Sequence, residues 1–485
     1  MLQDVLLTNT EKKKIDFFYR METVPVGEYT IHTLSKKLKM NYVFLQQLLL
    51  DLDKELIEIG EQPLLIDQKK KLLWDKEASR LDNYLVHLWH RSIPYQFLLW
   101  SLVYPEKKLA DFCAVHSISE TTAVRRLKPF VTYLSRYEIT VNVASMQLTG
   151  RESILRLMYI KFLWICSSGT DLSMAKQSFE AEKKLAQELA AELQDHIHQQ
   201  LVFLLLGVCR LRNETGNWLA VTPFEELLFP KAEQQVRTYL KSFLEDSLQV
   251  TRNVEFINYL IYYYPYAIDC QSQAAQPLLM YYQKNLEEGH SLYLAIETFY
   301  HQSLLEWMPA LEDYKQKETL MSNIITTFLN YSIQKNNVPL LFKPTQEQSI
   351  LHSEQYTVLF PKVKRIVLSL SRRNGLEWMG PISDSMARSL SLALMPFYQL
   401  DSKKRKRKVG LVAINDPLQR KQLDYFFKKF DFVETIYDPS PNEAIDLYVT
   451  HSADLLTDTQ QPYFLIDRLK GHFESELVDF LFDTY

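Results

Sequence analysis

The sequence predicts a mainly α protein with two winged helix-turn-helix modules, then two helical bundles, then a small C-terminal α/β domain. Three observations lead to this fold class. The chain has 485 residues, which is more than one hydrophobic core holds. Helix-favouring residues such as leucine, lysine, glutamate and glutamine dominate long stretches, whereas only 11 residues are glycine. Beyond residue 409, short apolar runs alternate with helical patterns. We expect five domains, at residues 1–80, 81–168, 169–288, 289–402 and 403–485.

Composition excludes several classes of protein. The scarcity of glycine disfavours dinucleotide-binding and P-loop folds, whose backbones approach phosphate at glycines. The sequence has no Gly-x-Ser-x-Gly, His-Glu-x-x-His or Walker motif, so we expect no enzyme and no cofactor. A metal site or a disulfide framework is not implied, because no CxxC pair occurs among Cys113, Cys166, Cys209 and Cys270. The sequence shows no signal-peptide pattern and no apolar run near 20 residues, which predicts a cytoplasmic protein with no membrane partner.

The first 80 residues predict a small helical module that ends in a hairpin. Residues 8–22 have a helical pattern, and residues 29–38 and 42–52 form two further helices around a short break. Two short helices joined by a tight turn are typical of the helix-turn-helix. Residues 64–66 and 72–74 could then form the wing.

Residues 81–168 repeat this plan more clearly. Leu109 to Val115 is a short helix, His116 to Ile118 is the turn, and Ser119 is a good N-cap for the next helix. Residues 139–143 and 146–149 alternate like a two-stranded wing. Pro129 lies inside the second helix, where a kink is expected. The inward stripe of that helix is expected to be Val124, Leu127, Val131 and Leu134.

The second helix of this module carries the best-supported DNA-binding residues. Arginine pairs with guanine O6 and N7, and threonine contacts phosphate or a thymine methyl. From Arg91 to Arg151 the chain has eight Lys or Arg and four Asp or Glu, although its overall net charge is −4. The alternative is a helix whose basic face is merely solvated. The predicted DNA contacts are Thr121, Thr122, Arg125, Arg126 and Lys128.

The first module has a weaker DNA-binding pattern. Tyr42, Gln46 and Gln47 are predicted to face outward from its second helix, and glutamine can read adenine. However, residues 1–80 carry 13 basic and 13 acidic residues, which give no net attraction to DNA. A winged-helix fold used for packing or partner contact therefore stays open.

The rest of the chain divides into a helical part and an α/β part. Residues 170–400 are nearly all helical in pattern, and the basic run at 401–408 reads as a solvated linker that could also touch DNA or an acidic partner. The segments after it predict strands at 409–414, 433–437, 447–450 and 463–466, with helices at 417–430 and 472–482.

The segment from Leu109 to Leu134, the wing after it, and Leu148-Thr-Gly-Arg-Glu-Ser-Ile-Leu-Arg156 resemble the Mga family of Gram-positive virulence regulators. The resemblance extends over the whole layout. It implies two helix-turn-helix modules, two helical domains regulated by the sugar phosphotransferase system (PRD-like domains), and a C-terminal domain similar to the EIIB component of that system. It also implies transcription control, promoter DNA as partner, and a homodimer or higher oligomer.

The resemblance further implies phosphorylation of histidines by phosphocarrier proteins of the phosphotransferase system. Alignment places Phe203 and Tyr262 at the two histidine positions expected in the first helical domain. The nearest substitutes are His196 and His198, and His352 in the second helical domain is another. The alternative, that each is simply a surface histidine, is the more common case.

The EIIB-like domain lacks the phosphocysteine of its relatives. The loop after its first strand reads Asn415-Asp416-Pro417, and Asp416 would repel phosphate. We therefore interpret the domain as structural or dimerising. The alternative function for the whole chain is an RNA-binding antiterminator or a sugar-sensing interaction scaffold without DNA binding, although an antiterminator would begin with a β-rich RNA module.

Overall fold

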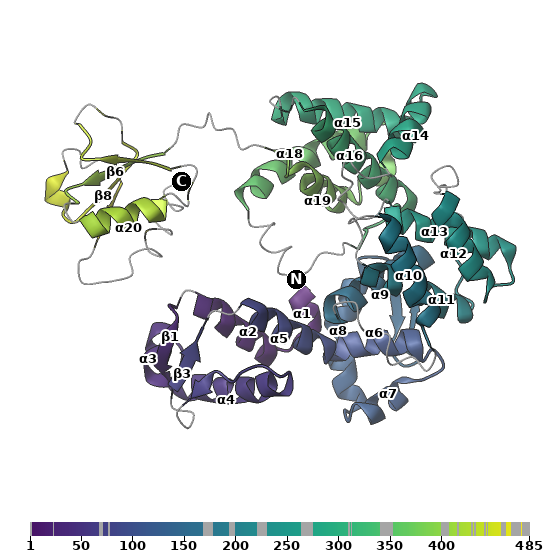
Figure 1. Cartoon of the computed structure of the whole chain (residues 1–485), viewed down its shortest axis with the longest axis horizontal. Helices are drawn as coiled ribbons and strands as arrows, with labels where there is room; N and C mark the ends of the chain where they lie inside the picture. Colours follow the sequence, from purple (N-terminus) through teal and green to yellow (C-terminus); the bar gives the residue numbers. More distant parts are fainter. Residues whose placement is uncertain are drawn as a thin grey trace. The chain divides into compact units, whose positions relative to one another are not determined.

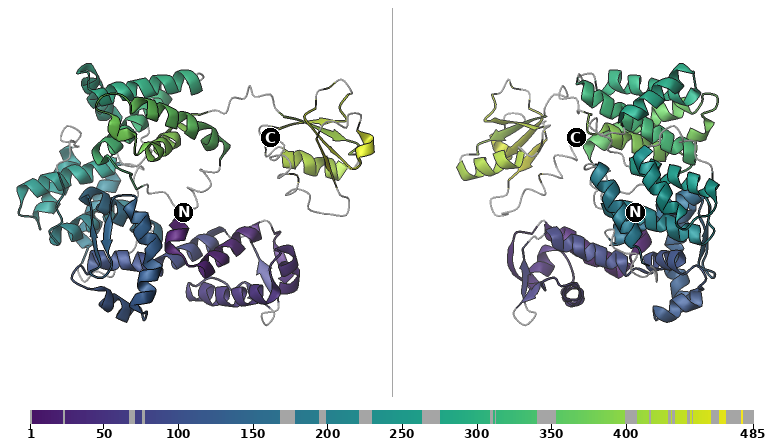
Figure 2. Two further views of the ribbon diagram at one scale, coloured as in Figure 1. Left: turned by 180° about the vertical axis from the view of Figure 1, so that it is seen from behind. Right: turned by 45° about the vertical axis from the view of Figure 1, so that its right-hand side comes forward.

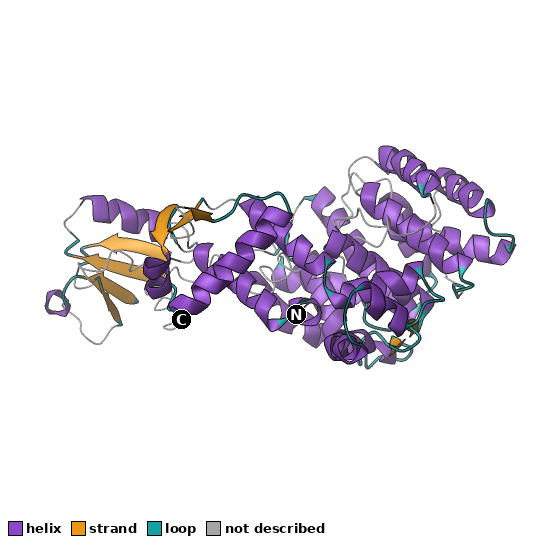
Figure 3. Ribbon diagram, turned by 90° about the horizontal axis from the view of Figure 1, so that it is seen from below, coloured by secondary structure: helices purple, strands orange, loops and turns teal. Residues whose placement is uncertain are grey.

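The computed structural model is mostly helical, with small sheets in three places (Figures 1 and 3). It forms two compact units, Met1–Tyr398 and Gln399–Tyr485. The mainly α fold class with a small α/β region is thereby confirmed. The structure describes residues 2–22, 24–66, 71–75, 78–167, 178–193, 199–220, 230–262, 275–308, 311, 313–339, 353–398, 407–414, 417–427, 430, 433–440, 443, 445–456, 462–466 and 477.

The first module joins its helices to a three-stranded sheet. Its elements are α1 (Leu2–Leu6), α2 (Asn9–Glu22), β1 (Gly27–Thr30), α3 (Ile31–Lys37), α4 (Tyr42–Glu58), β2 (Leu65–Ile66) and β3 (Lys71–Trp74). The sequence predicted only the hairpin of β2 and β3. The structure adds β1, which pairs antiparallel with β3 from Gly27 opposite Trp74 to Thr30 opposite Lys71. Thr30 and Asn41 cap α3 and α4, because their side-chain oxygens accept from Thr33 N and Phe44 N.

The second module has five helices and a two-stranded wing. Its elements are α5 (Ala78–His90), α6 (Ile93–Val103), α7 (Leu109–Val115), α8 (Glu120–Ser135), β4 (Thr140–Asn142), β5 (Gln147–Thr149) and α9 (Glu152–Ser167). The wing strands pair antiparallel, with Thr140 opposite Thr149. Helix α9 is buried along most of its length and packs on α5, α6 and α11.

The helical part of the first unit contains two groups of packed helices. In the first group α10 packs on α11, and α12 packs on α13. In the second group α14 and α15 pack on α16, and α19 packs on α16 and α18. The bounds are α10 (Glu180–Leu193), α11 (Gln199–Glu214), α12 (Pro230–Lys241), α13 (Ser247–Tyr262), α14 (Ala275–Glu287), α15 (Ser291–Trp307), α16 (Tyr314–Gln334), α18 (Glu354–Leu370), η2 (Glu377–Met379) and α19 (Ser383–Leu394).

The C-terminal unit has a parallel four-stranded sheet in the order β7-β6-β8-β9, with α20 against it (Figure 2). Its elements are β6 (Arg407–Val412), α20 (Pro417–Phe427), β7 (Val433–Tyr437), β8 (Leu447–Thr450), η3 (Ala453–Leu455) and β9 (Tyr463–Leu465). All four residues of β8 are buried, as is usual for a central parallel strand. The helix predicted at 472–482 lies outside the described residues, except for Leu477 in the core.

No helix in the described part of the chain is long and apolar enough to cross a bilayer. Cys113, Cys166 and Cys209 are free and buried, whereas Cys270 lies outside the described residues. Burial raises the pKa of the Cys166 and Cys209 thiols, which are therefore poor nucleophiles at neutral pH.

Candidate nucleic-acid interface

The turn between α7 and α8 has the tight geometry of a helix-turn-helix. His116 ends α7, Ser117 takes a left-handed conformation with φ 51°, and the Ile118 amide donates to the Cys113 carbonyl. The Ser119 side chain then accepts from the Thr122 amide at 3.2 Å and caps α8, as predicted. These contacts set the direction in which α8 leaves the turn.

Helix α8 separates into a buried face and an exposed face. Its buried residues are Ala123, Leu127, Phe130 and Leu134. The predicted inward stripe was partly wrong. Val124 is 49% exposed and Val131 is only half-buried, because Phe130 instead inserts against Phe162 of α9, with 5.4 Å between ring centroids.

The exposed surface of α8 carries three cations. At about 100° per residue, one outward stripe contains Thr121, Val124, Arg125 and Lys128, all of which are exposed. Arg126 is also exposed but lies about 100° round the helix from Arg125. Among the described residues, neither arginine forms an ion pair, so both guanidinium groups are available to an anionic ligand.

Two features distinguish α8 from a regular, uninterrupted recognition helix. Thr122 is half-buried, and its hydroxyl accepts from the Ser119 hydroxyl at 2.9 Å, so this residue, predicted to contact DNA, also takes part in the cap. The helix extends through Pro129 to Ser135, and the Pro129 side chain is exposed. Pro129 removes one backbone donor, but it does not end the helix.

Two further cations lie beside α7, and the sequence analysis did not predict either of them as a DNA contact. Lys107 and Lys108 are exposed immediately before this helix. The Lys108 amide donates to the Asp111 carboxylate at 3.0 Å, which fixes the start of α7. In helix-turn-helix complexes the first helix crosses the DNA backbone, where lysine contacts phosphate. The position of these two lysines directly before the helix predicted from Leu109 could have identified them in the sequence.

The first module presents a less basic surface. Tyr42 is 43% exposed, Gln46 is half-buried and Gln47 is exposed, broadly as predicted. However, the Gln47 amide donates to the Asp51 carboxylate at 3.0 Å, one turn along the same face of α4. This places a negative charge beside the residue expected to read adenine, which disfavours close approach of phosphate.

The segment from Leu148 to Arg156 connects the wing to a buried polar cluster. Arg156 is completely buried and donates to Glu152, to the side-chain oxygens of Asn253 (2.6 Å) and Asn213 (2.9 Å), and to a carbonyl. Arg212 also binds Glu152, at 2.7 Å. This cluster, hereafter the Arg156 cluster, joins α9 to α11 and α13.

The same segment also contacts the end of α16. Arg151 donates to the carbonyls of Ile333 (3.0 Å) and Gln334, which are free at the C-terminus of that helix. The Ser153 hydroxyl donates to the Gln334 side chain at 2.8 Å. Asn336 and Asn337 in turn donate to the carbonyls of Tyr137 and Arg136, just after α8. The last residues of α16 and the two asparagines after it therefore contact the segments that precede and follow the wing.

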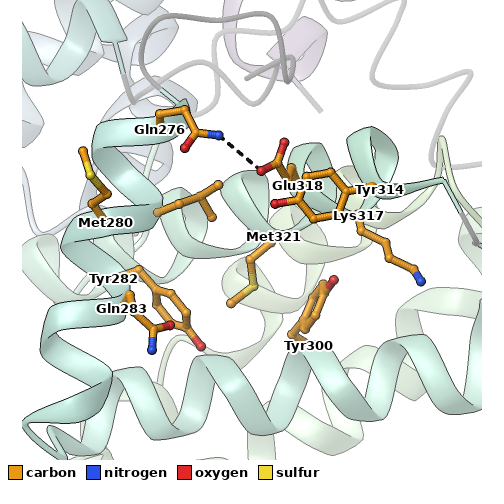
Figure 4. A pocket seen from close by; sticks show the side chains of 10 residues that line it. Gln276, Met280, Tyr282, Gln283, Tyr300, Tyr314, Lys317, Glu318 and Met321 are labelled. Atoms are coloured by element: carbon orange, nitrogen blue, oxygen red, sulfur yellow. Dashed lines mark hydrogen bonds between the residues drawn. The ribbon is translucent and has the colours of Figure 1, made fainter.

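A cavity of about 420 Å³ lies among α14, α15 and α16 (Figure 4). Tyrosines and methionines line it together with Gln276, Lys317 and Glu318. The Glu318 carboxylate in this lining already accepts a hydrogen bond from the Gln276 side chain, at 3.2 Å. This lining differs in character from the basic face of α8.

Several predicted sites lie outside the described residues. They are His196, His198, His352, Asn415 and Asp416. The side chains of Tyr262 and Pro417 are likewise not described. Phe203, aligned with an expected histidine, packs against Phe179 with 6.2 Å between ring centroids.

A serine-capped helix with a basic outward stripe, preceded by a short helix and followed by a hairpin, defines a winged helix-turn-helix module. The family model of the Mga helix-turn-helix domain matches residues 77–163, which run from α5 into α9. This match supports membership of the Mga regulator family, as residues 109–156 predicted. It indicates a DNA-binding transcription regulator. No curated protein matches the chain.

Proposed function

We propose that the chain controls transcription by binding promoter DNA through α8 of the second module. The observation that carries this proposal is the exposed stripe of Thr121, Arg125 and Lys128 on the capped helix of an Mga-type domain. Arg125 lies on the face opposite the core and reads a base, whereas Arg126 and the lysines before α7 contact phosphate.

The test compares Arg125→Ala with Arg126→Ala on a duplex selected by the full-length protein from a random pool. Loss of the Arg125 contact should cost about 1–3 kcal/mol and relax sequence preference at one base pair. Loss of Arg126 should weaken binding to all sequences and lower the salt slope by about one unit. The double variant should lose specific binding altogether, and normal binding by it would refute the assignment.

Gel shifts with duplex DNA and with hairpin RNA separate this function from that of an antiterminator. A regulator of transcription initiation shifts the duplex, and an antiterminator shifts the hairpin. An interaction scaffold shifts neither.

The C-terminal unit is the proposed dimerisation element. It forms a separate compact unit, and promoter sites are usually read by symmetric dimers. Deletion of residues 405–485 should lower self-association and transcriptional output. Light scattering that gives the same mass for both proteins would place the dimer interface elsewhere.

Regulation by histidine phosphate is the proposed input from the helical domains. A phosphate adds about −1.5 to −2 charge and would shift the packing of the helices around it. Because Phe203 and Tyr262 occupy the two expected positions, phosphotransfer to the first helical domain should be weak or absent. Incubation with the general phosphotransferase proteins and labelled phosphoenolpyruvate measures this. Residual label should disappear when His196, His198 and His352 are all changed to alanine.

The Leu148–Arg156 segment supports a physical route for such an input. It follows the wing directly, and it contacts α11 and α13 through the Arg156 cluster and α16 through Arg151. A change in helix packing on either side would therefore act on the wing, whose strand β4 packs against α8.

A further inference from the structure

Val124 presents an apolar side chain on the face of α8 that we assign to DNA. It is 49% exposed, and it lies one turn from Thr121 and one turn from Lys128. The buried face of the helix is complete without it, since Ala123 and Leu127 fill the adjoining inward positions. A β-branched residue that is half-exposed gains only part of the stabilisation that burial gives, and it is a weaker helix former than alanine. Val124 therefore contributes little to the fold.

The chemistry of the major groove supplies a partner for such a side chain. The 5-methyl group of thymine is the apolar group on the base edges there, and apolar side chains contact it. Val124 and Arg125 are consecutive residues, about 1.5 Å apart along the helix axis and about 100° apart around it. This axial offset is smaller than the rise of about 3.4 Å between base pairs, so side chains that diverge from these two positions reach adjoining base pairs. A valine beside Arg125 then adjoins the base pair next to the guanine that Arg125 contacts.

We infer that Val124 is a specificity-determining residue that contacts the 5-methyl group of a thymine adjoining the guanine read by Arg125. This inference rests on the proposed function, because it requires α8 to enter the major groove. It adds to that function a preference for a thymine at a fixed place beside the guanine.

The experiment removes only the methyl group from the DNA. A duplex selected by the full-length protein from a random pool is remade with each thymine replaced in turn by uracil, which pairs identically but lacks the 5-methyl. Affinities are measured for the wild type, for Val124→Ala, and for the matched control Leu305→Ala, which truncates a 78%-exposed residue of α15. Alanine at 124 is a better helix former, so the variant should fold.

The wild type and Leu305→Ala should lose roughly three- to fivefold in affinity at one thymine, the amount expected for one buried methyl group. Val124→Ala should bind the thymine duplex correspondingly less tightly and should not respond to uracil at that position. Equal sensitivity of Val124→Ala and wild type to uracil would overturn the inference, as would a wild type indifferent to every replacement. Failure to select any duplex would overturn the proposed function itself, and the inference with it.

Discussion

Arg156→Ala should destabilise the second module strongly, because Arg156 is completely buried and holds several partners together. The guanidinium is completely buried and donates to a carboxylate, two asparagine side chains and a carbonyl. Removing one partner from a buried charged cluster costs about 3–5 kcal/mol. Glu152 keeps Arg212 at 2.7 Å, so we expect the lower end, about 3 kcal/mol.

Urea unfolding followed by tryptophan fluorescence measures this loss, because Trp89 and Trp100 are buried in the same module. At a slope of about 1–3 kcal/mol per molar, the midpoint should fall by about 1–3 M. Arg126→Ala is the matched control, since an exposed arginine without an ion pair in the described residues should shift stability by less than about 0.5 kcal/mol. The reasoning fails if the two variants unfold at the same urea concentration.

A double variant tests whether the cluster acts as a unit. Arg156→Ala together with Arg212→Ala leaves the Glu152 carboxylate without either of its cations. The combined loss should therefore exceed the sum of the single losses by about 0.5–3 kcal/mol. Simple additivity would show that the two arginines do not share this carboxylate.

Three further outcomes follow from local contacts. Gly150→Ala should cost about 1–3 kcal/mol, seen as a lower melting temperature, because its Cβ would lie 2.9 Å from the Glu138 carbonyl oxygen; an unchanged value contradicts this. Burial lowers the pKa of His116 in the folded protein, so the neutral imidazole favours the folded state fully above about pH 6.5, and this contribution is lost as the pH falls. The free energy of unfolding of His116→Leu should therefore decrease less than that of the wild type between pH 7.5 and 5.5, and equal decreases count against this. Replacing Asn336 and Asn337 by alanine should speed hydrogen exchange in residues 136–153, and unchanged protection would argue against the contact.

The local signals of the second module were sufficient to place its helix-turn-helix and its wing, but not α5 and α6. Ser119 was predicted as an N-cap, and its side chain caps α8. The break at residues 116–118 and the two wing segments also matched the structure. Caps and turns are fixed by residues close together in the chain, and for this reason the sequence alone reveals them.

Sequence periodicity could not determine which face of α8 is buried. Two apolar sets in this helix have helical spacing, one containing Val124 and Val131 and the other containing Ala123 and Phe130. The contact of Phe130 with Phe162 of α9 selects the second set. That choice depends on the shape of the neighbouring helix, which the periodicity of α8 does not contain.

The sequence by itself therefore determined the helix-turn-helix with its serine-capped second helix, the wing and the basic residues of that helix, because short-range patterns specify them. Only the tertiary structure decided that Val124 faces outward and that Arg156 is buried. Asn213 and Asn253 lie 57 and 97 residues from Arg156 along the chain. A charged residue gives no local sign of whether such distant partners will surround it, since burial of a charge is stable only when they do.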